Sequence, residues 1–163
     1  MENIHKLSAN RLELHELSDI VFFNIKIRLS EDSKKAIKSC RYYLDEKISK
    51  EESPIYGINT GFGSLCNVKI SKDKLVKLQE NLIMSHACGT GEKVPKPIIK
   101  LMLFLKIQSL SYGHSGVQLE TVERLVDFYN NDILPVIYTQ GSLGASGDLA
   151  PLAHLALPLL GKG

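Results

Sequence analysis

The stretch Gly141-Ser-Leu-Gly-Ala-Ser-Gly-Asp-Leu-Ala-Pro151 places three glycines within seven positions, directly before an apolar segment. Its ordinary interpretation is a turn that leads into a helix, with Asp148 or Ser146 as the cap and Pro151 in the first turn. A Walker loop would need Lys and then Ser or Thr where Asp148 stands, and a dinucleotide-binding loop would need Gly-x-Gly-x-x-Gly. A serine-hydrolase elbow would need Gly-x-Ser-x-Gly, and Gly144-Ala-Ser-Gly147 is one residue short. The stretch therefore matches none of these three sites.

A reaction of the backbone accounts for the order of residues 145 to 147. If the amide nitrogen of Gly147 attacks the carbonyl carbon of Ala145, a five-membered ring closes through Ser146. Loss of two waters then leaves an imidazolone with an exocyclic methylidene. Gly147 and Ala145 are small enough to allow the approach, and Ser146 supplies the hydroxyl that is eliminated. The product would be an electrophile made from main chain.

Composition limits the classes of protein that need to be considered. The 163 residues, 44% of them hydrophobic and 23% charged, suffice for one globular core. A formal net charge of +2 gives no reason to expect nucleic acid as a partner. The chain has no apolar run of about 18 residues, and its first residues lack the features of a signal peptide, so we expect a cytoplasmic protein without a membrane partner. Three cysteines without a C-x-x-C pair favour reduced thiols, and the five scattered histidines form no metal motif.

Helical periodicity dominates the remaining pattern. Apolar residues recur at three-to-four spacing in segments that are bounded by serine, proline or glycine. We expect helices from Ser18 or Ser30 to about Lys50, from Ser71 to near Gly89, from Pro95 to Gly113, from about Leu119 to Asn130, and from Asp148 to Leu160. Strand signals are confined to the alternating run 12–17 and the β-prone run 133–138. The sequence therefore predicts a mainly α fold with small marginal strands.

Three blocks of sequence resemble the histidine/aromatic amino acid ammonia-lyase family. The first is the stretch from Gly141 extended to His154, which is similar to the family's signature. The second, Tyr56-Gly-Ile-Asn-Thr-Gly-Phe-Gly63, resembles the family's tyrosine loop, and the third, Leu78-Gln-Glu-Asn-Leu-Ile-Met-Ser-His-Ala-Cys-Gly89, resembles its first substrate-facing helix. The resemblance covers the chain from about residue 7 onward. It implies the amino-terminal portion of the helical fold that ammonia-lyases share with fumarase and aspartase.

The resemblance also implies roles for individual residues. Ala145, Ser146 and Gly147 would form the prosthetic group 4-methylidene-imidazol-5-one, with no metal or nucleotide cofactor. Tyr56 would be the base that removes the β-proton of the substrate, a task for which it needs nearby hydrogen-bond donors, because an ordinary tyrosine has a pKa of about 10. The ordinary interpretation of Tyr56 is a surface turn residue. Six residues would shape the loops: Asn59, Gly61, Gly63, Gly141, Gly144 and Asp148, of which Asp148 also fits a helix cap.

The pair Ser85-His86 bears on the substrate. Histidine-specific family members carry Ser-His here, whereas members that prefer phenylalanine or tyrosine tend to carry Phe-Leu or His-Leu. The resemblance therefore implies elimination of ammonia from L-histidine to give trans-urocanate, with His86 in contact with the imidazole or the carboxylate. The ordinary interpretation of His86 is a satisfied histidine near a helix end.

Family members are roughly three times as long as this chain, so we expect residues 1–163 to be an amino-terminal domain whose carboxy-terminal helical part is absent. A carboxy-terminal lyase polypeptide or further subunits would then be needed for activity, and a homo-oligomer is expected. Two alternatives stay open: a non-catalytic module that binds a partner subunit, and a lyase for another aromatic amino acid.

Overall fold

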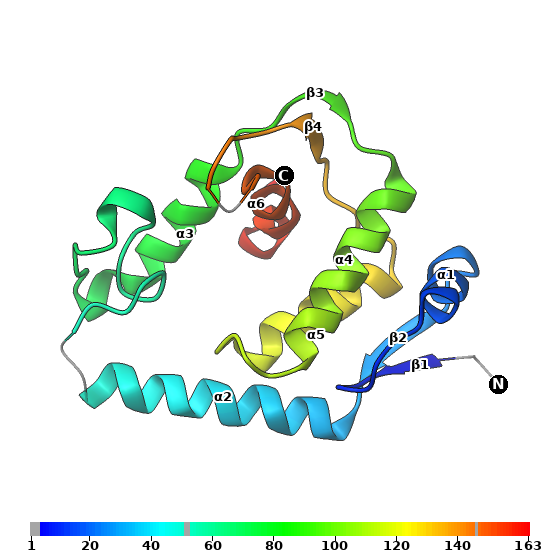
Figure 1. Cartoon of the computed structure of the whole chain (residues 1–163), viewed down its shortest axis with the longest axis horizontal. Helices are drawn as coiled ribbons and strands as arrows, with labels where there is room; N and C mark the ends of the chain where they lie inside the picture. The colour runs from blue at the N-terminus through cyan, green and yellow to red at the C-terminus, as the bar shows by residue number, and fades with distance from the viewer. Residues whose placement is uncertain (1–3, 51–52, 146) are drawn as a thin grey trace. The chain divides into compact units, whose positions relative to one another are not determined.

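The computed structural model describes residues 4–50, 53–145 and 147–163, and helices dominate them (Figure 1). The α-helices are α1 (Leu14–Phe22), α2 (Glu31–Lys50), α3 (Leu75–His86), α4 (Lys96–Ser111), α5 (Leu119–Asn130) and α6 (Ala150–Ala156). The strands are β1 (Ile4–Leu7), β2 (Lys26–Leu29), β3 (Thr90–Lys93) and β4 (Tyr138–Gln140). Short 3-10 helices cover Gly63–Leu65, Lys72–Lys74 and Leu157–Leu160. The prediction of a mainly α fold with small strands is confirmed.

Contacts divide the chain into two units. The first contains the residues up to Ser49 together with Pro95–Leu134, and the second contains Lys50–Val94 together with Pro135–Gly163. Each unit is thus assembled from two separated segments. No linker composition marks this division in the sequence, and the first boundary falls at the end of α2, between Ser49 and Lys50.

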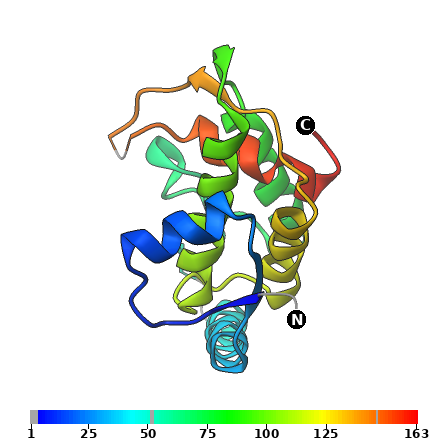
Figure 2. The same ribbon diagram turned by 90° about the vertical axis from the view of Figure 1, so that its right-hand side faces the viewer.

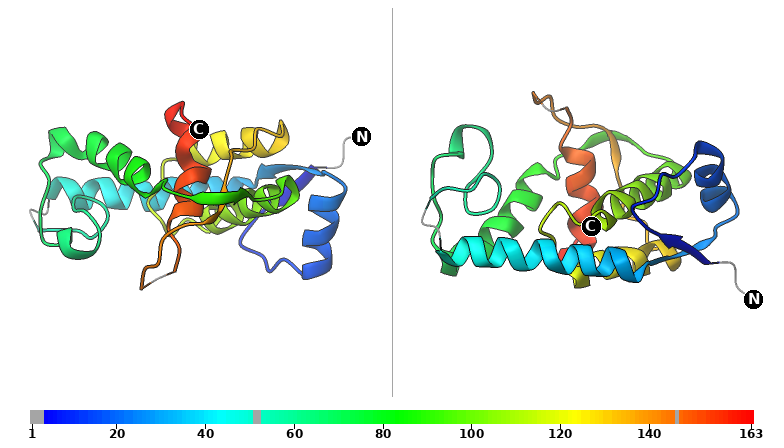
Figure 3. Two further views of the ribbon diagram at one scale, coloured as in Figure 1. Left: turned by 90° about the horizontal axis from the view of Figure 1, so that it is seen from above. Right: turned by 60° about the horizontal axis from the view of Figure 1, so that its bottom comes forward.

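The first unit is built on α4 and α5, which pack against each other. Leu103, Phe104 and Ile107 of α4 and Val122 and Tyr129 of α5 are almost completely buried, and the rings of Phe104 and Tyr129 lie 5.9 Å apart between centroids. Strands β1 and β2 pair in parallel, with Leu7 opposite Leu29. Figure 2 views α2 nearly along its axis, and Figure 3 shows it as one straight helix.

Asn130 joins α5 to β2 through both atoms of its side-chain amide. The backbone N–H of Ile27 donates to Oδ1 of Asn130 at 2.9 Å, and Nδ2 of Asn130 donates to the Ile27 carbonyl at 2.9 Å. The amide therefore pairs with Ile27 as the backbone of a neighbouring strand would. Because Ile27 is 1% exposed, water cannot easily replace these bonds.

Replacing Asn130 with leucine is expected to lower the free energy of unfolding by about 2–4 kcal/mol, since two buried backbone groups lose their partners. Urea denaturation measures the change. The matched control is Asn131→Leu, because the side chain of Asn131 donates an exposed hydrogen bond, to the carbonyl of Asp127. Equal losses in the two variants would contradict the role assigned to Asn130.

His5 on β1 is a source of pH dependence. Its ring lies 6.4 Å from that of Phe104, and burial lowers its pKa below the ordinary 6.5, while the negative charge of Glu16 has a smaller, opposite effect. The unfolded chain therefore binds a proton at a higher pH than the folded chain does. Since the unfolded state gains the proton first, the free energy of unfolding must fall as pH drops below the unfolded value.

We expect His5→Gln to reduce this loss of stability between about pH 7.5 and pH 5. The measurement is the free energy of unfolding in urea at the two pH values. His15 is exposed, so His15→Gln serves as the control for the loss of a histidine from the surface. A His5→Gln variant with an unchanged pH dependence would show that another group is responsible.

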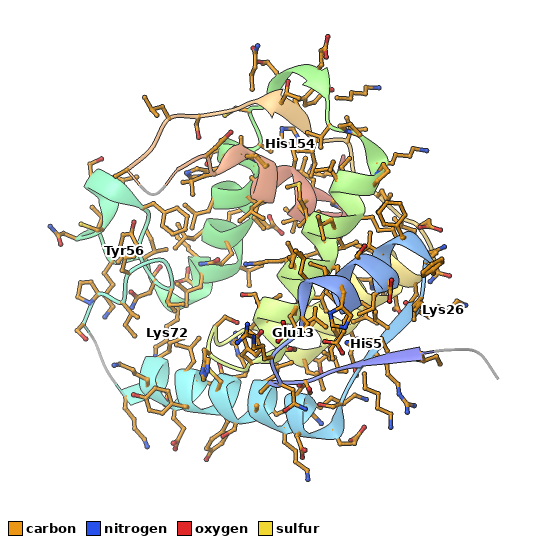
Figure 4. All side chains as sticks on the ribbon, turned by 45° about the vertical axis from the view of Figure 1, so that its right-hand side comes forward. His5, Glu13, Lys26, Tyr56, Lys72 and His154 are labelled. Carbon is orange, nitrogen blue, oxygen red and sulfur yellow. The ribbon has the colours of Figure 1, made fainter. Side chains whose placement is uncertain are left out.

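The second unit contains α3 packed against α6, and β3 paired antiparallel with β4, with Thr90 opposite Gln140 and Lys93 opposite Tyr138. His154 of α6, labelled in Figure 4, connects these elements. The N–H of Gly89 donates to Nε2 of His154 at 3.0 Å, and the His154 ring lies edge-on to that of Tyr138 at 5.6 Å. His154 is 8% exposed, and its contacts with Gly89 and Tyr138 hold α6 to the residue that precedes β3 and to the start of β4.

Two expectations about local structure were wrong. The alternating run 12–17 is not a strand: α1 begins at Leu14, where the N–H of Glu13 donates to the carboxylate of Glu16 at 2.9 Å and so stabilises the first helical turn. The run 133–138 becomes a strand only from Tyr138, because Pro135 has no N–H to donate to a ladder.

The predicted helix boundaries lie close to those in the structure. Of the two alternatives for the start of α2, Ser30 is correct, since its Oγ accepts from the N–H of Ser33 at 3.1 Å. The last predicted helix is shorter than expected, because a 3-10 helix containing Pro158 follows α6 at Leu157–Leu160.

Candidate functional site

The glycine loop, residues 141–149, turns the chain back on itself before α6. The N–H of Gly144 donates to the carbonyl of Gly147 at 3.2 Å, and the N–H of Gly147 donates to the carbonyl of Gly144 at 3.1 Å. Gly147 has φ +100°, a conformation that favours glycine, and a Cβ placed on it would meet no atom within 4 Å. Ser146 lies outside the described residues. Gly144 and Gly147 form an isolated antiparallel bridge, and the N–H of Gly147 is directed back to the carbonyl of Gly144 at the start of the turn.

Asp148 closes the base of this loop. Its Oδ1 accepts from the N–H of Ser142 at 2.8 Å, from the Ser142 hydroxyl at 3.2 Å and from the N–H of Ala150 at 3.0 Å. The backbone N–H groups of Ser142 and Ala150 are the main reason that the pKa of the Asp148 carboxyl is lowered. A Cβ on Gly141 would lie 2.1 Å from Oδ2 of Asp148, so only glycine fits beside the carboxylate. Asp148 thus holds the two ends of the loop together and also binds the first turn of α6.

The second loop, residues 53–63, carries Tyr56 and is held by its own polar side chains. Oδ1 of Asn59 accepts from the N–H of Ile55 at 2.6 Å, and Nδ2 of Asn59 donates to the carbonyl of Ser53 at 3.2 Å. Oγ1 of Thr60 accepts from the N–H of Gly57 at 3.2 Å and donates to the carbonyl of Gly61 at 3.0 Å. Asn59 and Thr60 are buried, at 4% and 0% exposure. They fix the path of the loop from inside.

Tyr56 itself, labelled in Figure 4, is 62% exposed. Its hydroxyl accepts from the N–H of Gly63 at 3.4 Å, and Gly63 has φ +57°. A Cβ on Gly61 would lie 2.7 Å from Cβ of Leu65, so the turn that brings Gly63 to the hydroxyl needs glycine at position 61. The site thus provides a backbone donor to a tyrosine hydroxyl that solvent and small molecules can reach.

Phe62 connects Tyr56 to His86. Its ring lies 5.7 Å from that of Tyr56 and 5.6 Å, edge-on, from that of His86. A Cβ on Gly57 would lie 2.9 Å from the Phe62 ring, and Gly57 has φ +69°, so glycine is required there for the ring to pack. The tyrosine loop is thereby placed against the carboxy-terminal end of α3.

The hydrogen bonds of His86 define which of its nitrogens is available. Nδ1 lies 2.7 Å from the carbonyl oxygen of Leu82 and 3.3 Å from the hydroxyl of Ser85, which also donates to the Leu82 carbonyl at 3.2 Å. Because a carbonyl oxygen only accepts, Nδ1 carries the hydrogen. In the neutral ring, Nε2 is then a hydrogen-bond acceptor, and no hydrogen bond to it is formed by residues 4–50, 53–145 and 147–163.

The structure brings Tyr56, Phe62, Ser85 and His86 into one group and holds Gly141, Gly144, Gly147 and Asp148 in another. Among residues 53–145 and 147–163, no hydrogen bond or ring contact joins the two groups. Sequence reasoning assigned no role to Phe62 or to Gln79, whose contacts with the tyrosine loop are described below. Phe62 was part of a recognised block, but nothing in its spacing distinguished it from a core residue.

The described residues contain no cluster of His, Cys, Asp or Glu arranged to hold a metal ion, and their cysteines are free. Within the same part of the chain, none of the helices has both the length and the hydropathy needed to cross a bilayer.

Comparison with known proteins defines the class to which this fold and site belong. The family model for aromatic amino acid lyases matches residues 12–163. The chain is 46% identical over 157 residues to histidine ammonia-lyase of Legionella pneumophila strain Philadelphia 1, with coverage of 96% of this chain and 31% of the relative. It is 49% identical over 152 residues to histidine ammonia-lyase of Deinococcus radiodurans, with coverage of 93% and 29%.

Solved structures of a histidine ammonia-lyase and of a tyrosine aminomutase also resemble this chain. Histidine ammonia-lyase from Trypanosoma cruzi superposes with a TM-score of 0.83 at 34% identity, over 98% of this chain and 30% of that chain. Tyrosine aminomutase from Streptomyces globisporus superposes with a TM-score of 0.87 at 30% identity, again over 98% and 30%. The chain belongs to the aromatic amino acid lyase family. It spans about a third of the length of the curated relatives that it matches.

Proposed function

We propose that Ala145, Ser146 and Gly147 form 4-methylidene-imidazol-5-one and that the chain serves in the elimination of ammonia from L-histidine to give trans-urocanate. The observation that carries the proposal is the mutual hydrogen bonding of Gly144 and Gly147, which turns the Gly147 nitrogen back along the chain. The open space around Gly147 and its φ of +100° also fit the group. When formed, the group supplies an electron-poor alkene that withdraws electron density from the bound substrate.

The chain's own residues account for proton removal and substrate recognition. Tyr56 Oη would take the β-proton, since its ring is exposed and its hydroxyl has a backbone donor in Gly63. Nε2 of His86 is an acceptor in the neutral ring, so it would accept a hydrogen bond from the imidazole N–H of the substrate; a carboxylate has no hydrogen to offer it. The pair Ser85-His86 and the names of the relatives both favour histidine over other aromatic amino acids.

Further polypeptide is required to complete the site in this proposal. Residues 141–145 and 147–149 are exposed, and no described contact links them to Tyr56 or His86. An electrophile in open solvent would lack the water-excluding surroundings in which such groups act. We infer that residues 1–163 act as an amino-terminal domain, in a cytoplasmic oligomer, together with a carboxy-terminal lyase polypeptide or further subunits.

Urocanate formation from histidine tests the function. The chain is assayed alone and co-expressed with the carboxy-terminal polypeptide of a histidine ammonia-lyase relative, and urocanate is followed by its absorbance. Urocanate should appear in the combined sample, and neither phenylalanine nor tyrosine should be converted at a comparable rate. Conversion of phenylalanine or tyrosine in preference to histidine would overturn the substrate assignment. A combined sample that converts none of the three would overturn the catalytic proposal and favour a non-catalytic partner module.

A further inference from the structure

The tyrosine loop is attached to α3 at two places. Near the start of the helix, Nε2 of Gln79 donates to the carbonyl of Gly57 at 3.2 Å and to the carbonyl of Ile58 at 3.2 Å. At the end of the helix, the Phe62 ring packs edge-on against His86. Residues 79 and 86 are seven apart, so they lie on one face of α3, about 10 Å apart along its axis. The loop therefore runs along this face of α3, with Gly57 and Ile58 attached at Gln79 and Phe62 attached at His86.

The chemistry of the first attachment is specific to the residue type. Both partners of Gln79 are carbonyl oxygens, and only the NH₂ end of the amide has two hydrogens to donate to them. Gly57, one of the two residues held, packs against Phe62 and directly follows Tyr56. A shift of the Gly57 carbonyl therefore moves Tyr56 and Phe62 together, relative to His86.

We propose that Gln79 is a positioning residue, which fixes the Tyr56 hydroxyl at a set distance from His86 by anchoring Gly57 and Ile58 to α3. The proposal rests on the function proposed above, in which Tyr56 takes the proton and His86 binds the substrate ring. In this role Gln79 does not contact the substrate. A residue with this role should affect the rate of the proton-transfer step more than the binding of histidine, because the transition state depends most steeply on the placement of the base.

Gln79→Met tests the anchor. Methionine has nearly the same size and helix propensity as glutamine but has no donor. Gln79→Lys restores donors at this position, because an ammonium group has three hydrogens. The matched control is Lys77→Met, which removes an exposed polar side chain of the same helix that pairs with Glu80 at 3.2 Å.

Two measurements are made on the set of variants. Nuclear Overhauser contacts between the rings of Tyr56, Phe62 and His86 are recorded on this chain. The kcat and KM for histidine are measured on the chain co-expressed with the carboxy-terminal polypeptide. We expect Gln79→Met to lose most of the ring contacts and about 10- to 100-fold in kcat with little change in KM. Gln79→Lys and Lys77→Met should keep the contacts and most of the rate.

The outcomes separate this proposal from the function on which it rests. If Gln79→Met keeps the ring contacts, or if Lys77→Met loses them equally, Gln79 is not a positioning residue. If Gln79→Met raises KM and leaves kcat unchanged, it acts on substrate binding and the proposal is overturned. If unsubstituted protein forms no urocanate, the proposed function fails, while the ring contacts still decide whether Gln79 positions the loop.

Discussion

If residues 145 to 147 cyclise as proposed, the unsubstituted chain loses two waters, and Gly147→Ala is expected to keep both of them. Gly147 adopts φ +100°, a backbone angle that residues other than glycine rarely adopt. An alanine there would also place a methyl group next to the nitrogen that must attack the carbonyl carbon of Ala145. Intact-mass spectrometry of the chain, co-expressed with the carboxy-terminal polypeptide, measures the result. The unsubstituted chain should be lighter than its sequence mass by two waters, and the variant should match its sequence mass.

A second glycine separates ring closure from simple backbone strain. Gly161 has φ +68°, and a Cβ placed on it would also meet nothing within 4 Å, but it lies beyond the glycine loop. Gly161→Ala should therefore suffer a similar strain and still lose both waters. A Gly147→Ala chain that loses both waters would contradict the proposed attack, and retention of the waters in both variants would point to a general loss of structure.

Helices were the part of the fold that sequence patterns predicted well. The helix expected from Leu119 to Asn130 has those bounds in the structure, because its buried positions Val122, Leu125, Val126 and Tyr129 recur at helical spacing. The strands were mostly missed. Pairing of β1 with β2 brings Ile4 next to Lys26, and such non-local contacts leave little trace in a run of only four residues.

The candidate site shows the same division between local and non-local information. Glycine spacing and residue order in the stretch from Gly141 pointed to the turn at Gly144 and Gly147, since this turn depends on neighbours in sequence. Gln79 could not be identified in this way. Its two bonds reach carbonyls 21 and 22 residues away, and a glutamine on a helix surface has no pattern that distinguishes it from a solvated one.

Tyr56→Phe is expected to lower kcat for histidine by about 10²- to 10⁴-fold, the range lost when a general base is removed. The ring and its packing on Phe62 would be retained, and only the hydroxyl that accepts from Gly63 would be lost. Because the proposed role of the hydroxyl is to take the β-proton in the transition state, KM should change little. Urocanate formation in the co-expressed sample provides both constants.

Tyr43 supplies the matched control, because it is 63% exposed, against 62% for Tyr56, and lies on α2. Tyr43→Phe should keep the full rate. If Tyr56→Phe keeps it as well, the β-proton is taken by another group and the exposed tyrosine is a surface residue of the turn. If Tyr56→Phe instead raises KM with kcat unchanged, the hydroxyl binds the substrate and does not remove its proton, and the base would have to come from the polypeptide that completes the site.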